Sequence, residues 1–226
     1  MERIRMKDMI TIALAKGRLA EQAIILLEKC GIECAELKKS TRKLVFYDSS
    51  GQFRFILVKP SDVPTYVEYG VADIGIAGKD TLMEANSPLY EMLDLGFGKC
   101  KLCIAGFPEG VAGSITAANK RVATKYPNIA RNLYAARGET IEIIKLNGSV
   151  ELGPLVGLSD VILDIVESGK TLKANGLIVL EEICDISARL VVNRVSLKTK
   201  GDGIKSLIQN MKRFLEEYRN DQNNEV

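Results

Sequence analysis

Short apolar runs that alternate with helical patterns constrain the fold of this chain more than any other feature of its sequence. Residues 10–15 form one such run, and apolar side chains then recur at helical spacing from Leu19 to Cys30. Further strand candidates follow at residues 44–46, 53–58, 73–77, 102–107, 121–124, 141–144, 161–163 and 177–180. Strands that alternate with helices predict an α/β fold. The 226 residues suffice for one large domain or two small ones, each with its own core.

The chain contains no histidine, which narrows the chemistry available to it. Histidine is the usual general base near neutral pH and the commonest transition-metal ligand. Ser-His-Asp and Cys-His catalysis are therefore excluded. Any reaction has to depend on carboxylates, main-chain amides, lysine, arginine or a metal ion that a substrate carries in.

Charge and hydropathy give no sign of a nucleic-acid or membrane partner. The formal net charge is only +2, and no apolar run approaches the ~20 residues of a membrane helix. Residues 10–15 are too short a run for the core of a signal peptide, so we expect a cytoplasmic protein. The five cysteines are expected to be reduced core residues. Cys100-x-x-Cys103 has no second pair and no histidine to complete a zinc site.

Residues 161–172 contain the strongest candidate binding site. The expected strand at 161–163 ends at Asp164, and a short loop then leads toward a helix through Glu167, Ser168, Gly169, Lys170 and Thr171. Such a loop can direct successive main-chain N–H groups at a phosphate, while Asp164 could accept hydrogen bonds from ribose hydroxyls. The alternative is an ordinary turn with Ser168 as a helix cap, because the segment is not a full Walker A motif.

Two further segments follow expected strands. Lys16-Gly17-Arg18 places two cations where open α/β sheets bind ligands, with Arg18 suited to bidentate phosphate contact. Solvated surface charge is the alternative for this segment. In the second, residues 148–154, a glycine and a serine could open a helix that starts near Glu151, although Glu151 could also serve only the helix dipole.

Several long motifs in the same order resemble the short form of ATP phosphoribosyltransferase. The motifs are AKGR at 15–18, PSDVPTYV at 60–67, ADIGIAGKD at 72–80, GSVE at 148–151, DIVESGKTL at 164–172 and NGL at 175–177. The similarity extends from Ile10 to about Tyr218. It implies a two-lobed α/β clamshell similar to periplasmic binding proteins, with two or more crossings between the lobes and substrates in the cleft. The first lobe would be residues 1–98 with 181–226, on the ATP side, and the second would be residues 99–180, with the phosphoribosyl diphosphate loop.

The resemblance also implies which residues meet each substrate. Phosphoribosyl diphosphate would bind the loop of Glu167, Ser168, Gly169, Lys170 and Thr171, with its ribose near Asp164 and with Glu151 close by. ATP would meet Lys16, Gly17, Arg18, Arg42 and Lys59. The family often has arginine at position 59, so the lysine found here keeps the charge but not the bidentate geometry.

The activity implied is transfer of the phosphoribosyl group to N1 of ATP with release of diphosphate, the first step of histidine biosynthesis. The adenine nitrogen needs no deprotonation, so no catalytic acid or base is expected, and magnesium would be carried by the substrate. Short-form relatives work with a regulatory subunit that resembles histidyl-tRNA synthetase, in a hetero-octamer.

Two other functions fit parts of the sequence. One is a non-catalytic clamshell protein that binds a phosphorylated metabolite. The other is a phosphoribosyltransferase that acts on a free base, although those enzymes commonly place two adjacent acids before the loop and here Leu163 precedes Asp164.

Overall fold

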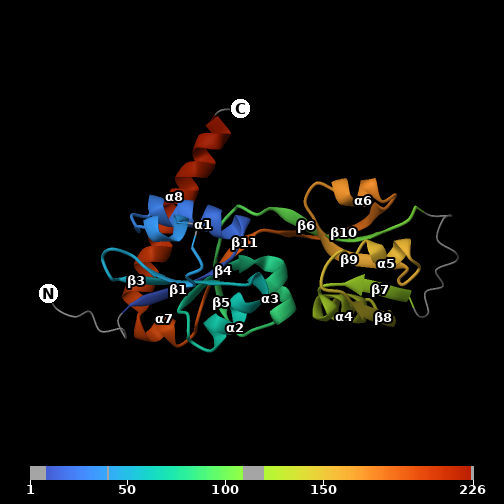
Figure 1. Ribbon diagram of the computed structural model, residues 1–226, viewed down its shortest axis with the longest axis horizontal. Coiled ribbons are helices and arrows are strands. Elements are labelled where there is room, and N and C mark those ends of the chain that lie inside the picture. The colour runs from blue at the N-terminus through green and yellow to red at the C-terminus, as the bar shows by residue number, and fades with distance from the viewer. Residues whose placement is uncertain (1–8, 40, 109–119, 225–226) are drawn as a thin grey trace. The chain divides into compact units, whose positions relative to one another are not determined.

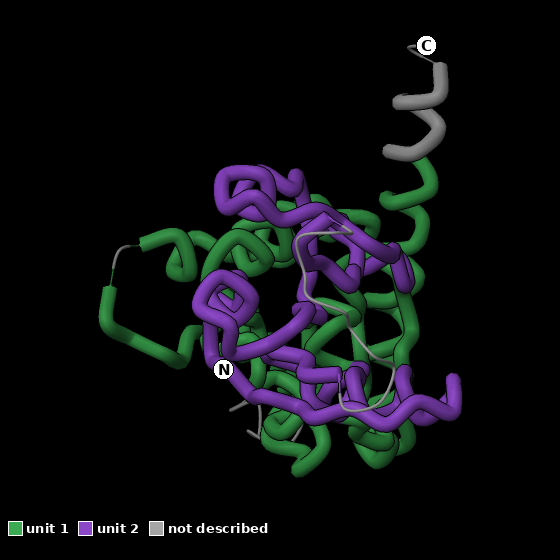
Figure 2. Tube along the Cα trace, turned by 90° about the vertical axis from the view of Figure 1, so that its right-hand side faces the viewer, with its two compact units in different colours: residues 1–82, 86–98, 187–226 green, residues 83–85, 99–186 purple. Residues whose placement is uncertain are grey.

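The computed structural model describes residues 9–39, 41–108 and 120–224, with side chains described as far as Glu217. Its contacts divide the chain into two compact units, coloured green and purple in Figure 2. Unit 1 comprises Met1–Leu82, Asn86–Gly98 and Ser187–Val226, and unit 2 comprises Met83–Ala85 and Lys99–Ile186. The lobe boundary near residue 181 that the resemblance implied falls inside a strand, Ile178–Ile186, which lies wholly in unit 2.

Unit 1 is built on a six-stranded mixed sheet in the order β2-β3-β1-β4-β11-β5 (Figure 1). Its strands are β1 (Ile10–Ala15), β2 (Val45–Tyr47), β3 (Phe53–Val58), β4 (Ile74–Gly78), β5 (Tyr90–Asp94) and β11 (Ala188–Val192). β1 runs parallel to both β3 and β4, whereas β2 and β11 are antiparallel to their neighbours. The carboxyl ends of β1, β3 and β4 therefore meet at one edge of this sheet.

Helices pack against both faces of this sheet because the side chains of β1 alternate between them. The helical elements of unit 1 are α1 (Arg18–Lys29), η1 (Ala35–Lys38), η2 (Pro60–Asp62), α2 (Val63–Glu68), α3 (Lys79–Ala85, whose last residues belong to unit 2), α7 (Ser196–Thr199) and α8 (Gly201–Asn224). Ile12 and Leu14 lie in a core cluster with residues of α1 and α8. Ala13 and Ala15 lie in the cluster that contains Val63 and Val67 of α2.

Unit 2 has a five-stranded sheet in the order β10-β6-β9-β7-β8. Its strands are β6 (Cys100–Gly106), β7 (Lys120–Thr124), β8 (Ile141–Lys145), β9 (Val161–Val166) and β10 (Ile178–Ile186), and its helices are α4 (Pro127–Ala136), α5 (Leu152–Leu155) and α6 (Lys170–Ala174). β7 lies between β8 and β9 and is parallel to both, so these three strands also share a carboxyl edge.

The structure differs from the sequence prediction in several strands of these sheets, and β10 continues to Ile186, beyond the strand expected at 177–180. β9 continues to Val166, because its pairing with β6 extends to Lys101, so Asp164 lies inside the strand and not at its end. β5 and β11 are absent from the prediction, and both belong to the antiparallel part of the unit 1 sheet.

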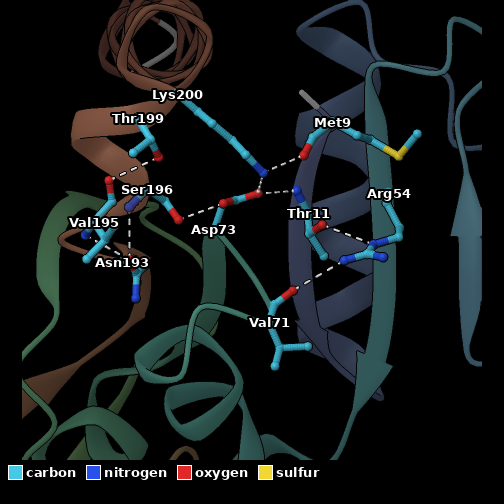
Figure 3. A network of polar contacts seen from close by, with 10 residues as sticks. All are labelled: Met9, Thr11, Arg54, Val71, Asp73, Asn193, Val195, Ser196, Thr199 and Lys200. Carbon is cyan, nitrogen blue, oxygen red and sulfur yellow. Dashed lines mark hydrogen bonds and ion pairs between the residues drawn. The ribbon is translucent and has the colours of Figure 1, made fainter. Parts of the chain in front are cut away.

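A buried carboxylate fastens the C-terminal segment of unit 1 to the sheet (Figure 3). Asp73 lies directly before β4 and is 4% exposed. Its oxygens accept hydrogen bonds from the Thr11 main-chain N–H at 2.8 Å, the Ser196 hydroxyl at 2.6 Å and the Lys200 ammonium at 2.7 Å. Lys200 also donates to the Met9 carbonyl at 2.7 Å. Asp73 therefore joins three segments far apart in the sequence at the amino end of β4.

Candidate functional site

Each parallel strand of unit 1 is followed directly by a lysine. Lys16 follows β1, Lys59 follows β3 and Lys79 follows β4. The register places Lys16 beside the end of β3, because its main-chain N–H donates to the Val58 carbonyl at 2.9 Å. Arg42 lies two residues before Leu44, whose carbonyl accepts the Leu57 N–H at 2.9 Å. The structure thus brings Lys16, Arg42 and Lys59 to one edge of the sheet.

These three cations are exposed and have no carboxylate partner among the described side chains, which distinguishes them from Lys79. Lys79, in contrast, pairs with Glu91 at 2.5 Å, and Arg189 pairs with both Glu91 and Asp94. The positive charge available to an anion at this edge therefore comes from the residues near β1 and β3.

Gly17 connects β1 to α1 in a conformation that favours glycine. Its φ is 103° and its ψ is −157°, a region that residues with a Cβ rarely adopt. The Gly17 carbonyl accepts the Ala20 N–H at 2.9 Å, so the chain enters the helix at once and Arg18 is its first residue. Gly17 thus places Lys16 at the strand end and Arg18 at the helix start, and both side chains are exposed.

In unit 2 the loop between β9 and α6 offers unused hydrogen-bond donors. In the described part of the chain, the main-chain N–H groups of Ser168, Gly169, Lys170 and Thr171 donate to no protein acceptor. Gly169 has φ 67° and ψ 4°, the left-handed conformation, as the residue directly before α6. The side chains of Glu167, Ser168, Lys170 and Thr171 are exposed, and Asp164 is half-buried on β9. Successive free amides with nearby hydroxyls and a lysine form an arrangement suited to a phosphate.

The start of α4, at the same carboxyl edge, is already occupied by a protein carboxylate. Glu84 accepts hydrogen bonds from the main-chain N–H groups of Asn128 and Ile129 at 3.0–3.1 Å, and its own carbonyl accepts the Asn128 side-chain amide at 3.0 Å. A carboxylate at a helix N-terminus satisfies donors that would otherwise attract an anion. The N-terminus of α4 is therefore not available to an anion, whereas the amides of the loop after β9 are.

The segment after β8 carries an unusual backbone. Ser149 has a φ of 47°, which is uncommon for a residue other than glycine and recurs at functional sites. Val150 is buried in the cluster that also holds Leu172 of α6, so the two segments share a packed base. Glu151 comes next, half-buried, directly before α5.

The predicted site residues therefore fall into two groups, one in each unit. Lys16, Gly17, Arg18, Arg42 and Lys59 lie at the carboxyl edge of the unit 1 sheet. Asp164, the loop of residues 167–171 and Glu151 lie at the carboxyl edge of the unit 2 sheet. The contact of Glu84 with α4 is absent from the sequence prediction, because it joins residues that are 44 and 45 positions apart.

The described residues contain neither a metal-binding cluster nor a membrane-spanning helix. The described residues contain no group of three or more histidine, cysteine or acidic side chains that could hold a metal ion. Among the same residues, no helix is long and apolar enough to cross a membrane. All five cysteines are described, and none forms a disulfide. Burial raises the pKa of the Cys103 thiol, as expected for a core cysteine.

Comparisons with known proteins point to one family. The family model described as "HisG: ATP phosphoribosyltransferase" matches residues 59–213. A curated ATP phosphoribosyltransferase of Ruminiclostridium cellulolyticum is 59% identical over 205 residues, which cover 90% of this chain and 95% of the relative. Another, from Caldanaerobacter subterraneus, is 52% identical over 208 residues and covers 92% and 98%.

Solved structures agree. The "ATP phosphoribosyl transferase (HisG:HisZ) complex" of Thermotoga maritima matches with a TM-score of 0.80 and 37% identity over 92% of this chain and 100% of that chain. The periplasmic aliphatic sulphonate binding protein SsuA of Escherichia coli matches with a TM-score of 0.57 at 12% identity, over 96% of this chain and 76% of that one. The second likeness concerns the fold alone and confirms the expected fold class. From the family model and the curated relatives together, the chain belongs to the ATP phosphoribosyltransferase family.

Proposed function

We propose that this chain is the catalytic subunit of a short-form ATP phosphoribosyltransferase that transfers the phosphoribosyl group of phosphoribosyl diphosphate to N1 of ATP. Members of its family catalyse this first step of histidine biosynthesis. The observation that carries the proposal is the loop after β9, where four successive main-chain N–H groups have no acceptor among the described residues. A member of this family needs one such anion-binding site for the phosphate of the sugar.

Phosphoribosyl diphosphate binds, in this proposal, at the carboxyl edge of the unit 2 sheet. The 5-phosphate accepts hydrogen bonds from the amides of residues 168–171 and from the hydroxyls of Ser168 and Thr171, and the Lys170 ammonium adds charge. Asp164 accepts from the ribose hydroxyls, while Glu167 and Glu151 lie beside the sugar. The left-handed Gly169 supports this role, because a residue without Cβ lets the main chain approach the anion.

ATP binds, in the same proposal, at the carboxyl edge of the unit 1 sheet. Its phosphates meet Lys16, Arg42 and Lys59, three cations that have no carboxylate partner among the described side chains. Gly17 and Arg18 follow β1, and the planar guanidinium of Arg18 suits bidentate contact with a phosphate. Lys59 stands where the family often has arginine, and it contributes a point charge in place of a fork of donors.

The reaction requires no proton transfer to activate the nucleophile. The adenine N1 lone pair attacks C1 of the ribose, the bond from C1 to the diphosphate oxygen breaks, and diphosphate leaves with that electron pair. Magnesium, carried by the diphosphate as part of the substrate, neutralises charge on the leaving group. The lysine and arginine side chains add electrostatic stabilisation, and alignment of two bound substrates can lower such barriers by roughly 7–11 kcal/mol. A chain without histidine is sufficient for these tasks.

The partner and location belong to the same proposal. The Thermotoga maritima relative was solved as a HisG:HisZ complex. We infer that this chain also works with a regulatory subunit that resembles histidyl-tRNA synthetase, as a hetero-octamer in the cytoplasm, and that histidine inhibits it through that subunit.

One assay tests the function against its rivals. The full chain is mixed with phosphoribosyl diphosphate, magnesium and ATP, with and without the candidate regulatory subunit, and diphosphate release is measured. Turnover that requires ATP supports the proposal. Ligand binding without turnover, even with the subunit, would indicate a non-catalytic binding protein, and turnover with a free base would indicate a different phosphoribosyltransferase.

A further inference from the structure

Thr124 lies at the carboxyl edge of the unit 2 sheet, on the middle one of its three parallel strands. It is the last residue of β7, the strand between β8 and β9, and its exposed fraction is 0%. The strand on one side leads to the loop of residues 167–171, and the strand on the other leads to residues 148–151. Thr124 therefore lies between the two segments to which we assign the phosphoribosyl group.

The hydroxyl of Thr124 makes two hydrogen bonds that fix its orientation. Its Oγ1 donates to the Leu163 carbonyl of β9 at 2.7 Å and accepts the Tyr126 main-chain N–H at 2.8 Å. Its main-chain carbonyl accepts the Leu146 N–H, at the end of β8, at 3.0 Å. One residue thus ties together the ends of β7, β8 and β9.

These contacts lie next to the proposed ligand groups in the sequence. Leu163 is directly followed by Asp164, and Leu146 is followed two residues later by the segment that ends at Glu151. The peptide carbonyl of Leu163 belongs to the same peptide plane as the main-chain N–H of Asp164. A bond to that carbonyl therefore restricts the backbone rotation that aims the Asp164 side chain.

Apolar packing alone does not supply this restraint. The cluster beneath the two segments contains Ala123, Val150, Ile162 and Leu172, and it holds them at a fixed distance. Contacts between apolar side chains are not directional, whereas a hydrogen bond is. A threonine with both donor and acceptor in use fixes orientation as well as distance.

We propose that Thr124 is a positioning residue for phosphoribosyl diphosphate, which it orients through the Leu163–Asp164 peptide and the ends of β8 and β9. The inference rests on the proposed function. In a simpler interpretation, the hydroxyl only stabilises the turn from β7 into α4. The two interpretations differ in whether loss of the hydroxyl changes the affinity for phosphoribosyl diphosphate.

The test uses the full chain with Thr124→Val, which keeps the branched shape and removes the hydroxyl, and Thr124→Ser, which keeps the hydroxyl. A second hydroxyl-free variant, Thr124→Ala, guards against a folding failure specific to valine. Tyr134→Phe is the matched control, because the Tyr134 hydroxyl is also buried in unit 2 yet has no hydrogen-bond partner among the described residues. Calorimetry measures the affinity for phosphoribosyl diphosphate with magnesium and, separately, for ATP. Hydrogen exchange follows the amide of Tyr126.

We expect Thr124→Val and Thr124→Ala to raise the Kd for phosphoribosyl diphosphate about tenfold or more, a factor that corresponds to about 1.4 kcal/mol. The ATP affinity should stay within about twofold, and Thr124→Ser and Tyr134→Phe should bind both ligands like the wild type. Faster exchange at Tyr126 with unchanged affinity for phosphoribosyl diphosphate would reduce Thr124 to a turn residue and overturn the inference. Equal losses for both ligands would also overturn it. A wild-type chain that does not bind phosphoribosyl diphosphate would refute the proposed function itself, and the inference with it.

Discussion

Replacement of Asp73 by asparagine should destabilise unit 1 without altering either substrate site. The change keeps the shape of the side chain and removes the charge that pairs with Lys200, whose side chain is 22% exposed. Breaking a buried ion pair costs about 3–5 kcal/mol. Because water can reach the Lys200 ammonium in part, we expect a smaller loss, about 2–3 kcal/mol, close to that of a hydrogen bond to a charged group. For a chain of this length, that corresponds to a fall in Tm of roughly 4–12 °C.

Thermal unfolding followed by circular dichroism measures this effect, and Lys200→Met provides the partner variant. Lys200→Met leaves Asp73 with its bonds from Thr11 and Ser196 but without its counter-charge, so it should be destabilising as well. If the two residues act as a pair, the free energy of unfolding of the double variant should fall by less than the sum of the falls in the two single variants, with a difference of at least about 1 kcal/mol. Asp73 lies at the amino end of β4, away from Lys79 at the carboxyl end, so the KM values should not change. An unaltered Tm, or a selective rise in the KM for ATP, would refute this reasoning.

Four further outcomes follow from the contacts described. Gly169→Leu should raise the KM for phosphoribosyl diphosphate at least about tenfold. Gly138→Leu is the control, because Gly138 has a similar φ of 70° in open space and its replacement should add only the left-handed backbone strain of about 1–2 kcal/mol. Equal KM values in the two variants would show that the loop is not part of the site. Arg18→Ala should weaken ATP binding in calorimetry, and normal affinity would contradict its assignment. Burial, with nearby Glu28, raises the pKa of the Cys34 thiol to about 12, so Cys34 should be the slowest of the five cysteines to react with iodoacetamide at pH 8, as mass spectrometry can check. The hydrogen bond from Arg137 lowers the pKa of Glu181 below its ordinary value of 4.5. The stability that this pair contributes is therefore present above pH 4.5 and is lost as the pH falls through the lowered pKa. In Glu181→Gln, the free energy of unfolding should therefore fall less steeply as the pH is lowered below 4.5. An unchanged pH dependence would argue against the pair.

Local patterns were sufficient to predict the elements that depend on local contacts. The apolar run of β1 and the helical spacing of α1 lie within 20 residues of each other, and both were confirmed. The same pattern placed Lys16 and Arg18 at a strand end, because the carboxyl end of a parallel strand can be recognised from the helix that follows it.

Long-range pairing explains what the sequence did not reveal. β11 inserts between β4 and β5, and Leu190 pairs with Ile76 and Leu93, partners about 100 residues away in the chain. β10 has acidic residues at 181, 182 and 185 because it is an edge strand, so its pattern is only partly apolar. Glu84 could not be assigned to α4 for the same reason, since no local signal links a carboxylate to a distant helix start.

The insertion of β11 also dictates an order of events during synthesis. Among the described strands, β5 has only β11 as a neighbour, yet residues 188–192 emerge from the ribosome long after residues 90–94. A nascent chain can therefore complete the sheet of unit 2 while β5 is still unpaired. Unit 1 therefore starts first and is completed last, and a chain that ended before residue 188 would have a complete unit 2 sheet, whereas β4 and β5 would lack the strand that joins them.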